Sequence, residues 1–146
     1  MKSEPSEFSI DDLATTKNNF WHGVRNYQVR NMFRDIMQAG DIALFYHSST
    51  KNIGIVGEME ITKSAKVDDS QFDISSKYYD AKSIPENPRW LAPTVSFIKK
   101  FDKIITLEQI KNNNIFLDLP LIKKGNRLSV MEITRKHYEA IIKLGK

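Results

Sequence analysis

The chain has 146 residues, a formal net charge of +4, and 40% hydrophobic against 27% charged residues. This size and composition predict one globular domain with a single core. No membrane association is expected, because no apolar run approaches the roughly 20 residues that cross a bilayer and the N-terminal segment lacks the apolar region of a secretory signal. The absence of cysteine excludes disulfides and thiolate metal sites, and it predicts a reducing compartment: the cytoplasm, or the nucleus in a eukaryote.

The N-terminal region predicts an extended entry followed by a short helix. A proline biases the residue before it away from helix, so residues 1–5 are expected to end a strand. Ser9 and Asp12 have the spacing of a capping box, which predicts a helix through about Ala14. Residues 15–20 are then expected to form a loop.

The strongest helix signal follows a turn at residues 21–27. Apolar side chains recur at the spacing of one helix face at Val29, Met32, Phe33, Ile36 and Met37. Asn26 is the predicted N-cap of this helix, and Gly40 is its predicted C-terminal stop.

Two strands are predicted after this helix. Residues 41–47 form a short apolar run that is typical of a buried strand. Residues 53–61 alternate between apolar and polar side chains, as a half-buried strand does. Gly54 and Gly57 in the second run indicate a bulge, or the close approach of another backbone or a ligand.

A long irregular segment occupies the middle of the chain. Residues 63–88 show no periodicity, and a loop of this length in a small domain is usually functional or packed down by its own aromatic residues. A strand is expected at residues 93–101, a short helix capped by Thr106, and an extended segment at residues 127–131.

The last predicted element is a helix capped by Thr134 and ended by Gly145, with Tyr138, Ile141 and Ile142 facing the core. In total, four or five strands and three or four helices are interleaved without the regular rhythm of a parallel α/β protein. The predicted fold class is therefore α+β, with a curved, partly closed mixed β-barrel and flanking helices.

The common catalytic signatures are missing. There is no Gly-rich phosphate loop and no nucleophile elbow. His22, His47 and His137 lack the spacing of zinc hydrolases and deaminases, so we expect neither a metal nor a cofactor. A small hydrolase using His47 and Glu4 stays open as an alternative. Ser48 would point to the opposite strand face from its neighbour His47, so we expect the histidine to make a structural or ligand hydrogen bond instead.

Aromatic residues at turns are the more informative signal. Trp21 and Trp90 are either core residues or stacking walls for a flat ligand. Trp21 stands in the sequence beside Arg25, Asn26 and Arg30, which supply charge, donors and an acceptor. A nucleic-acid base needs a ring to stack on and polar groups along its edge, so this cluster predicts a base-binding site.

A series of sequence blocks, in one order along essentially the whole chain, resembles the EVE domain family of the PUA-like superfamily. The blocks are Lys2-Ser3-Glu4-Pro5, Trp21-His22-Gly23-Val24-Arg25-Asn26-Tyr27-Gln28-Val29-Arg30-Asn31, Gly40-Asp41 leading to Leu44-Phe45-Tyr46-His47-Ser48, Ile55-Val56-Gly57, Gln71-Phe72-Asp73, Tyr79-Asp80, Pro88-Arg89-Trp90 and Arg127-Leu128-Ser129-Val130. The resemblance implies a PUA-like β-barrel with flanking helices, related to the YTH readers of methylated RNA. It also implies binding of modified bases, chiefly modified cytosines in DNA, in a pocket.

The resemblance implies a set of pocket residues, carried over by motif. They are Ser3, Glu4, Trp21, Val24, Arg25, Asn26, Tyr46, His47, Ser48, Trp90, Leu128, Ser129 and Val130, with Arg30 and Asn31 in support from the helix. Arg25, Arg30 or nearby lysines are expected to neutralise phosphate. The chain departs from the family at Thr94, where the family usually has an acid. If that acid reads an amino group of the base, base preference here is altered or weaker.

We therefore expect a single EVE domain over residues 1–146 that acts as a non-catalytic reader of a modified base, as a monomer or weak oligomer. DNA is the favoured partner, and an RNA-binding PUA-like module is the first alternative. The hydrolase described above and a protein-interaction module are the others.

Overall fold

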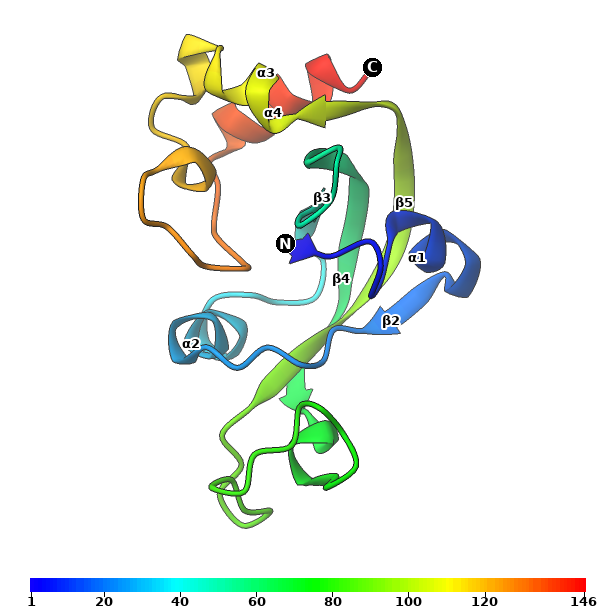
Figure 1. Ribbon diagram of the computed structural model, residues 1–146, viewed down its shortest axis with the longest axis vertical. Helices are drawn as coiled ribbons and strands as arrows, with labels where there is room; N and C mark the ends of the chain where they lie inside the picture. The colour runs from blue at the N-terminus through cyan, green and yellow to red at the C-terminus, as the bar shows by residue number, and fades with distance from the viewer. The chain divides into compact units, whose positions relative to one another are not determined.

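The computed structural model describes all 146 residues of the chain (Figure 1). Its strands and α-helices are β1 (Lys2–Ser3), α1 (Ile10–Thr16), β2 (Asn18–Phe20), α2 (Tyr27–Asp35), β3 (Ile42–His47), β4 (Gly54–Val67), β5 (Leu91–Thr106), α3 (Leu107–Lys111) and α4 (Arg135–Leu144). Three short 3₁₀ turns complete the structure: η1 (Asp69–Phe72), η2 (Asn114–Phe116) and η3 (Pro120–Ile122).

The strands form one mixed sheet in the order β1-β3-β4-β5-β2. β1 is parallel to β3, with Ser3 opposite His47, and β2 is antiparallel to β5, with Asn19 opposite Val95. Because β1 and β2 are edge strands, the sheet does not close on itself. The predicted α+β class is confirmed.

The residues group into two compact units. The first unit consists of Met1–Lys17, Ala43–Met59 and Phe97–Lys146. The second unit consists of Asn18–Ile42 and Glu60–Ser96. β4 and β5 each contribute residues to both units.

The core of the first unit is built by strands and by the C-terminal helices. Its buried cluster is Leu44, Tyr46, Ile55, Phe101, Ile105, Ile110, Phe116, Leu119 and Ile141. α3 and α4 lie side by side in Figure 1, and the predicted inward face of α4 is confirmed, because Tyr138 and Ile142 pack against this cluster. The sequence did not predict that His137, on the same helix, is also buried.

Both predicted strand glycines of the first unit are confirmed as points of close backbone approach. A Cβ atom at Gly54 would collide with the carbonyl oxygen of Ile105, and one at Gly57 would collide with that of Lys99. Each colliding atom belongs to the backbone of β5, which a side-chain movement cannot relieve. Any larger residue at these positions would therefore force the strands apart.

Helix α2, in the second unit, begins as predicted. The Oδ1 atom of Asn26 accepts the Val29 N–H at 3.0 Å, and Val29 and Phe33 are buried. The helix ends at Asp35, earlier than the predicted stop at Gly40. Beyond the helix the backbone pairs elsewhere, since the Gly40 N–H donates to the carbonyl oxygen of Ile61 at 2.7 Å.

The predicted loop at residues 15–20 is wrong in two respects. Helix α1 continues to Thr16, two residues past the expected end, and its predicted capping box between Ser9 and Asp12 is present. Asn18–Phe20 then forms strand β2. The strands expected at residues 53–61 and 93–101 are likewise longer than predicted, at 14 and 16 residues.

Candidate functional site

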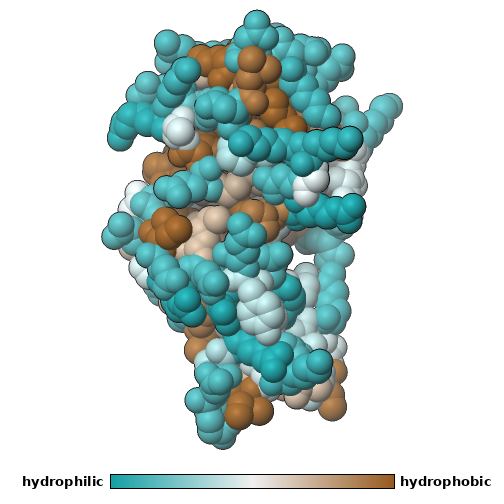
Figure 2. All heavy atoms as spheres, turned by 90° about the vertical axis from the view of Figure 1, so that its left-hand side faces the viewer, coloured by the Kyte–Doolittle hydropathy of each residue, from teal (hydrophilic) through white to brown (hydrophobic).

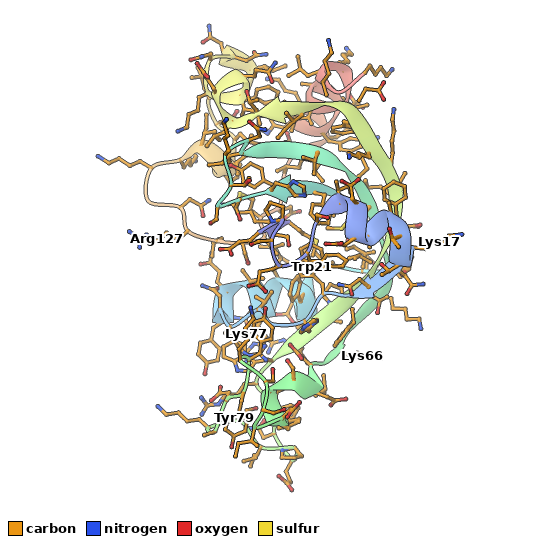
Figure 3. The ribbon with its side chains drawn as sticks, turned by 45° about the vertical axis from the view of Figure 1, so that its right-hand side comes forward. Lys17, Trp21, Lys66, Lys77, Tyr79 and Arg127 are labelled. Carbon is orange, nitrogen blue, oxygen red and sulfur yellow. The ribbon has the colours of Figure 1, made fainter.

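The turn that follows β2 carries Trp21, the aromatic residue at the centre of the predicted site. The backbone N–H of Trp21 donates to the carbonyl oxygen of Pro93 at 2.9 Å, so the turn is fixed to β5 within the second unit (Figure 3). The Trp21 residue is 7% exposed. Thr94, the predicted point of departure from the family, lies opposite Phe20 in the same pair of strands.

Gly23 is the one residue of this turn that the geometry requires to be glycine. Its φ of +91° lies in the left-handed region, which side chains rarely adopt. A Cβ atom here would also lie 2.6 Å from the ring of Tyr78. The Gly23 N–H donates to Oδ2 of Asp68 at 2.8 Å, so the turn is held against the segment that follows β4.

Arg25 is hydrogen-bonded through every N–H of its guanidinium group. Its Nε and Nη2 donate to the carbonyl oxygen of Tyr78 at 3.0 and 2.8 Å, and Nη2 also donates to Oγ of Ser70 at 3.0 Å. Its Nη1 donates to the carbonyl oxygen of Val24 and to Oδ2 of Asp68, both at 3.0 Å. A guanidinium has five N–H donors, so this side chain is fully used inside the second unit.

Asp68 is the acid that balances Arg25, and it is only 1% exposed. Burial raises the pKa of its carboxyl group. Hydrogen bonds from Gly23, Ser70 and Arg25, together with the charge of Arg25, outweigh that effect and hold the pKa below its usual range. The carboxylate is thus charged and satisfied, and it joins the Trp21 turn to the segment between β4 and β5.

A second buried polar group, Gln71, organises the rest of that segment. Its Oε1 accepts hydrogen bonds from the Ser83 hydroxyl at 2.5 Å and from the N–H groups of Arg89 and Trp90 at 3.1 and 3.0 Å. Its Nε2 donates to the carbonyl oxygens of Asp68 and Trp90 at 2.7 and 2.9 Å. One amide therefore fixes backbone groups up to 19 residues away in the sequence.

Trp90 is packed on the inside of the second unit. It is 5% exposed, and its Nε1–H donates to Oδ2 of Asp80 at 2.8 Å. The ring centroids of Tyr27 and Trp90 lie 4.8 Å apart, and the guanidinium carbon of Arg25 lies 5.6 Å from the Trp90 ring centroid. This indole is held in one orientation by contacts at its edge and its ring.

Arg30 and Asn31, predicted as supporting residues, lie on helix α2. The Arg30 Nε donates to Oδ1 of Asn31 at 3.0 Å, and its Nη1 donates to the carbonyl oxygen of Arg89 at 3.1 Å. The guanidinium also lies 4.9 Å from the centroid of the Tyr27 ring.

The outer surface of the same segment is apolar in places. Ile74 and Ile84 are 82% and 51% exposed. In Figure 2, apolar atoms appear at the foot of the view, over the segment between β4 and β5. Polar groups fix the segment predicted as an irregular loop from inside.

The remaining predicted residues lie in the first unit, around β1 and β3. The Ser3 hydroxyl donates to the carbonyl oxygen of Phe8 at 2.6 Å, and the Ser48 N–H donates to the carbonyl oxygen of Ser3 at 3.0 Å. The carbonyl oxygen of Ser129 accepts the Lys2 N–H at 2.8 Å. The structure therefore brings the serines of three distant segments together beside β1.

Other members of this set differ in exposure. Tyr46 and Val130 are buried at 6% and 2% exposed, whereas Glu4 is exposed. Leu128 is half-buried, and its N–H donates to Oδ1 of Asn126 at 3.0 Å.

The hydrogen bond predicted for His47 is confirmed as a structural one. Its Nε2 accepts the N–H of Ile10, the first residue of α1, at 3.1 Å. The ring also packs edge-on against Phe45, with 5.5 Å between ring centroids. Burial lowers the pKa of His47, and the charge of Lys100 lowers it further against the opposing effect of Asp11.

This lowered pKa makes a prediction about acid sensitivity. A proton on Nε2 would remove the acceptor for the Ile10 N–H, so the folded state resists protonation below the ordinary pKa of 6.5. Neutral His47 should make its whole contribution to the free energy of unfolding above that pH. The contribution should fall as the pH drops below it, because the unfolded chain then binds the proton more readily than the folded chain. Urea titrations at about pH 7 and about pH 5 should show a smaller fall for His47→Gln than for the wild type. An equal fall in both proteins would contradict this assignment.

No group of three or more His, Cys, Asp or Glu side chains is placed to hold a metal ion. None of the helices is long and apolar enough to cross a bilayer.

Residues 1–144 match the EVE domain family. Thymocyte nuclear protein 1 of Gallus gallus is 36% identical to this chain over 99% of its length, and that of Danio rerio is 37% identical over the same share. The chain belongs to the EVE domain family. This EVE chain spans about two thirds of those relatives, 66% of the chicken protein and 70% of the zebrafish protein.

Solved structures share this EVE fold closely. A crystal structure of a protein from Pseudomonas putida has a TM-score of 0.96 at 41% identity and covers 100% of this chain and 97% of its own. The human THYN1 protein, whose structure was solved in complex with DNA containing 5-methylcytosine, has a TM-score of 0.93 at 33% identity and covers 100% and 95%.

Two residues that organise this EVE chain, Asp68 and Gln71, were missed as site residues. Gln71 does stand in one of the blocks that carried the family resemblance, Gln71-Phe72-Asp73, and that position was the available signal. Asp68 gave no signal, because its partners Gly23 and Arg25 stand more than 40 residues earlier in the sequence.

Proposed function

We propose that this EVE domain, acting as one module, binds DNA without catalysing a reaction on it, and that it recognises a modified base of the 5-methylcytosine type. The observation that carries the proposal is the likeness over the whole chain to the human THYN1 protein, solved with 5-methylcytosine-containing DNA. The TM-score of 0.93 over 100% of this chain supports a shared fold for the two proteins.

The geometry of each unit supports a binding role for the residues that the family motif names. In the second unit, Trp21 sits on a turn that is fixed by hydrogen bonds at Trp21 itself and at Gly23. In the first unit, Ser3, Ser48 and Ser129 are fixed by backbone pairing around β1. Rigid placement of aromatic and polar groups is what base recognition requires, because a misplaced hydrogen bond loses selectivity.

The predicted residues fall into a base-contacting set and a structural set. We assign base contact to Trp21, Val24, Asn26 and Trp90 of the second unit and to Ser3, Glu4, Tyr46, His47, Ser48, Leu128, Ser129 and Val130 of the first. Arg25 is assigned to the structure of the turn, because none of its N–H groups is left for phosphate. Thr94 is the position at which we place a difference in base preference from the rest of the family.

The relatives are named as nuclear proteins. For this chain we propose a location where the genome is: the nucleus if the organism is a eukaryote, and otherwise the cytoplasm.

A binding titration tests the function. Duplexes that differ only in one 5-methylcytosine or cytosine should bind with different affinities, and Trp21→Ala should weaken binding of the preferred duplex by roughly 5- to 150-fold, the value of about 1–3 kcal/mol for a base stack. Phe20→Ala is the matched control, since it removes the neighbouring half-buried ring, whose centroid lies 5.3 Å from the Nζ atom of Lys66. Thr94→Asp, in the same assay, should change the ratio between bases.

Equal binding of both duplexes, weakened only by salt and unchanged in Trp21→Ala, would contradict the proposal. Thermal unfolding of each variant must accompany the titration, because Trp21 is mostly buried. A single-stranded DNA and an RNA of the same sequence distinguish the polymers, and preference for the RNA would replace DNA as the partner.

A further inference from the structure

The positive charge of this chain is concentrated in its C-terminal part. Residues 97–146 contain 11 Lys and Arg against 5 Asp and Glu, a net charge of +6. The second unit contains eight of each and is neutral. Because nucleic-acid backbones are bound mainly through Lys and Arg, phosphate contacts are expected from the first unit rather than from the turn around Arg25.

Within that part of the chain, one turn presents three cations on a fixed backbone. Lys123, Lys124 and Arg127 are all exposed. Gly125, between them, has a φ of +82° with open space around it, and the N–H of Asn126 donates to the carbonyl oxygen of Lys123 at 3.1 Å. Figure 3 shows Arg127 at the outer edge of the loop that follows η3.

The side chain of Asn126 locks this turn from inside. Its Nδ2 donates to the carbonyl oxygen of Pro120 at 2.8 Å, and its Oδ1 accepts the Leu128 N–H at 3.0 Å. The turn is thus tied to η3 on one side and to the residue after Arg127 on the other. An ordered turn loses less conformational freedom when it binds a ligand than a floppy one does.

The charges of this turn are not neutralised by an ion pair. Two other exposed cations of the first unit are paired, Lys100 with Asp11 at 2.8 Å and Arg135 with Glu139 at 4.0 Å. None of Lys123, Lys124 and Arg127 takes part in an ion pair. Their charge is available to an external anion.

The turn runs directly into the residues assigned to base contact. Arg127 precedes Leu128, and the carbonyl oxygen of Ser129 is held by the Lys2 N–H of β1 at 2.8 Å. A cation placed here would contact the backbone of the same strand whose base the next residues read, since each DNA strand carries one phosphate per about 3.4 Å of helix axis.

We propose that Lys123, Lys124 and Arg127 form a phosphate-binding turn that holds the DNA backbone next to the recognised base. This inference rests on the proposed function, and it adds the residues that supply the domain's affinity for the DNA backbone. The turn contributes to binding of every sequence equally, and base preference comes from other residues.

The test compares two triple variants of the full chain. Lys123→Gln, Lys124→Gln and Arg127→Gln together remove the turn's charge. Lys111→Gln, Lys136→Gln and Lys143→Gln together remove the same charge from exposed positions on α3 and α4. Affinities for the 5-methylcytosine and cytosine duplexes are measured at several salt concentrations.

We expect the turn variant to bind both duplexes more weakly by one common factor, with an unchanged ratio between them. Loss of three phosphate contacts should reduce the decline in affinity between about 50 and about 200 mM salt by roughly 40-fold. A turn variant that matches the control variant in affinity and in salt dependence would overturn the inference. Absence of any 5-methylcytosine preference in the wild type would instead overturn the proposed function, and the salt dependence would still decide the role of the turn.

Discussion

Asp68→Ala is expected to lower the free energy of unfolding by about 3–5 kcal/mol, because it leaves the Arg25 guanidinium without its buried counter-charge. The carboxylate is almost fully buried and also accepts the N–H groups of Gly23 and Ser70. Those donors would lose their acceptor as well. Urea denaturation followed by circular dichroism measures the loss.

Two further variants make this experiment selective. Asp69→Ala removes the neighbouring acid, which is exposed, and should change the free energy of unfolding by no more than about 0.5 kcal/mol. Asp68→Ala combined with Arg25→Met should be more stable than Asp68→Ala alone, because it removes the unpaired charge. If Asp68→Ala were as stable as Asp69→Ala, the pair would not hold the Trp21 turn.

Gln71→Leu should have a comparable effect, also about 3–5 kcal/mol, for a different reason. The side chain is fully buried, and leucine of similar size would leave the Ser83 hydroxyl and the N–H groups of Arg89 and Trp90 without an acceptor. Each unpaired buried polar group costs about 1–3 kcal/mol. Equilibrium unfolding in urea gives the size of the loss.

A second readout separates local from global damage in Gln71→Leu. Hydrogen exchange should accelerate first at the N–H groups between β4 and β5, which the amide fixes. Gln28→Leu, on the exposed face of α2, is the control and should stay within about 0.5 kcal/mol of the wild type. Unaltered exchange in the segment would show that Gln71 does not organise it.

Sequence reasoning succeeded where structure is decided within a few residues. The capping box of Ser9 and Asp12, the Asn26 cap and the Thr106 cap each depend on a side chain and a backbone N–H three residues away. The predicted alternation matches the burial of β4 over residues 57–61, whereas residues 54–57 are all buried. Gly54 and Gly57 predicted the close approach of another backbone, but the sequence did not indicate that this backbone is β5.

It failed where the deciding partner is distant. Asn18–Phe20 has no strand pattern of its own, and it is a strand because it pairs with β5 more than 70 residues later. Gly40, the predicted helix stop, instead donates its backbone N–H to the carbonyl oxygen of Ile61, five residues after α2 ends. The predicted phosphate role of Arg25 could not be judged from the sequence either, because its partners Asp68 and Tyr78 become neighbours only on folding.

The interleaving of the two units has a consequence for how the chain is made. The first unit contains both the first residues of the chain and α4, whose Ile141 is part of its core, so that core cannot be completed until nearly the whole polypeptide has left the ribosome. The second unit is closed by Glu60–Ser96 and can assemble earlier, since domains and their parts fold as they emerge. A fragment that stops before α4 therefore contains every segment of the second unit but lacks part of the first. Late C-terminal mutations, remote in sequence from Trp21, should therefore act on the yield of folded protein from synthesis.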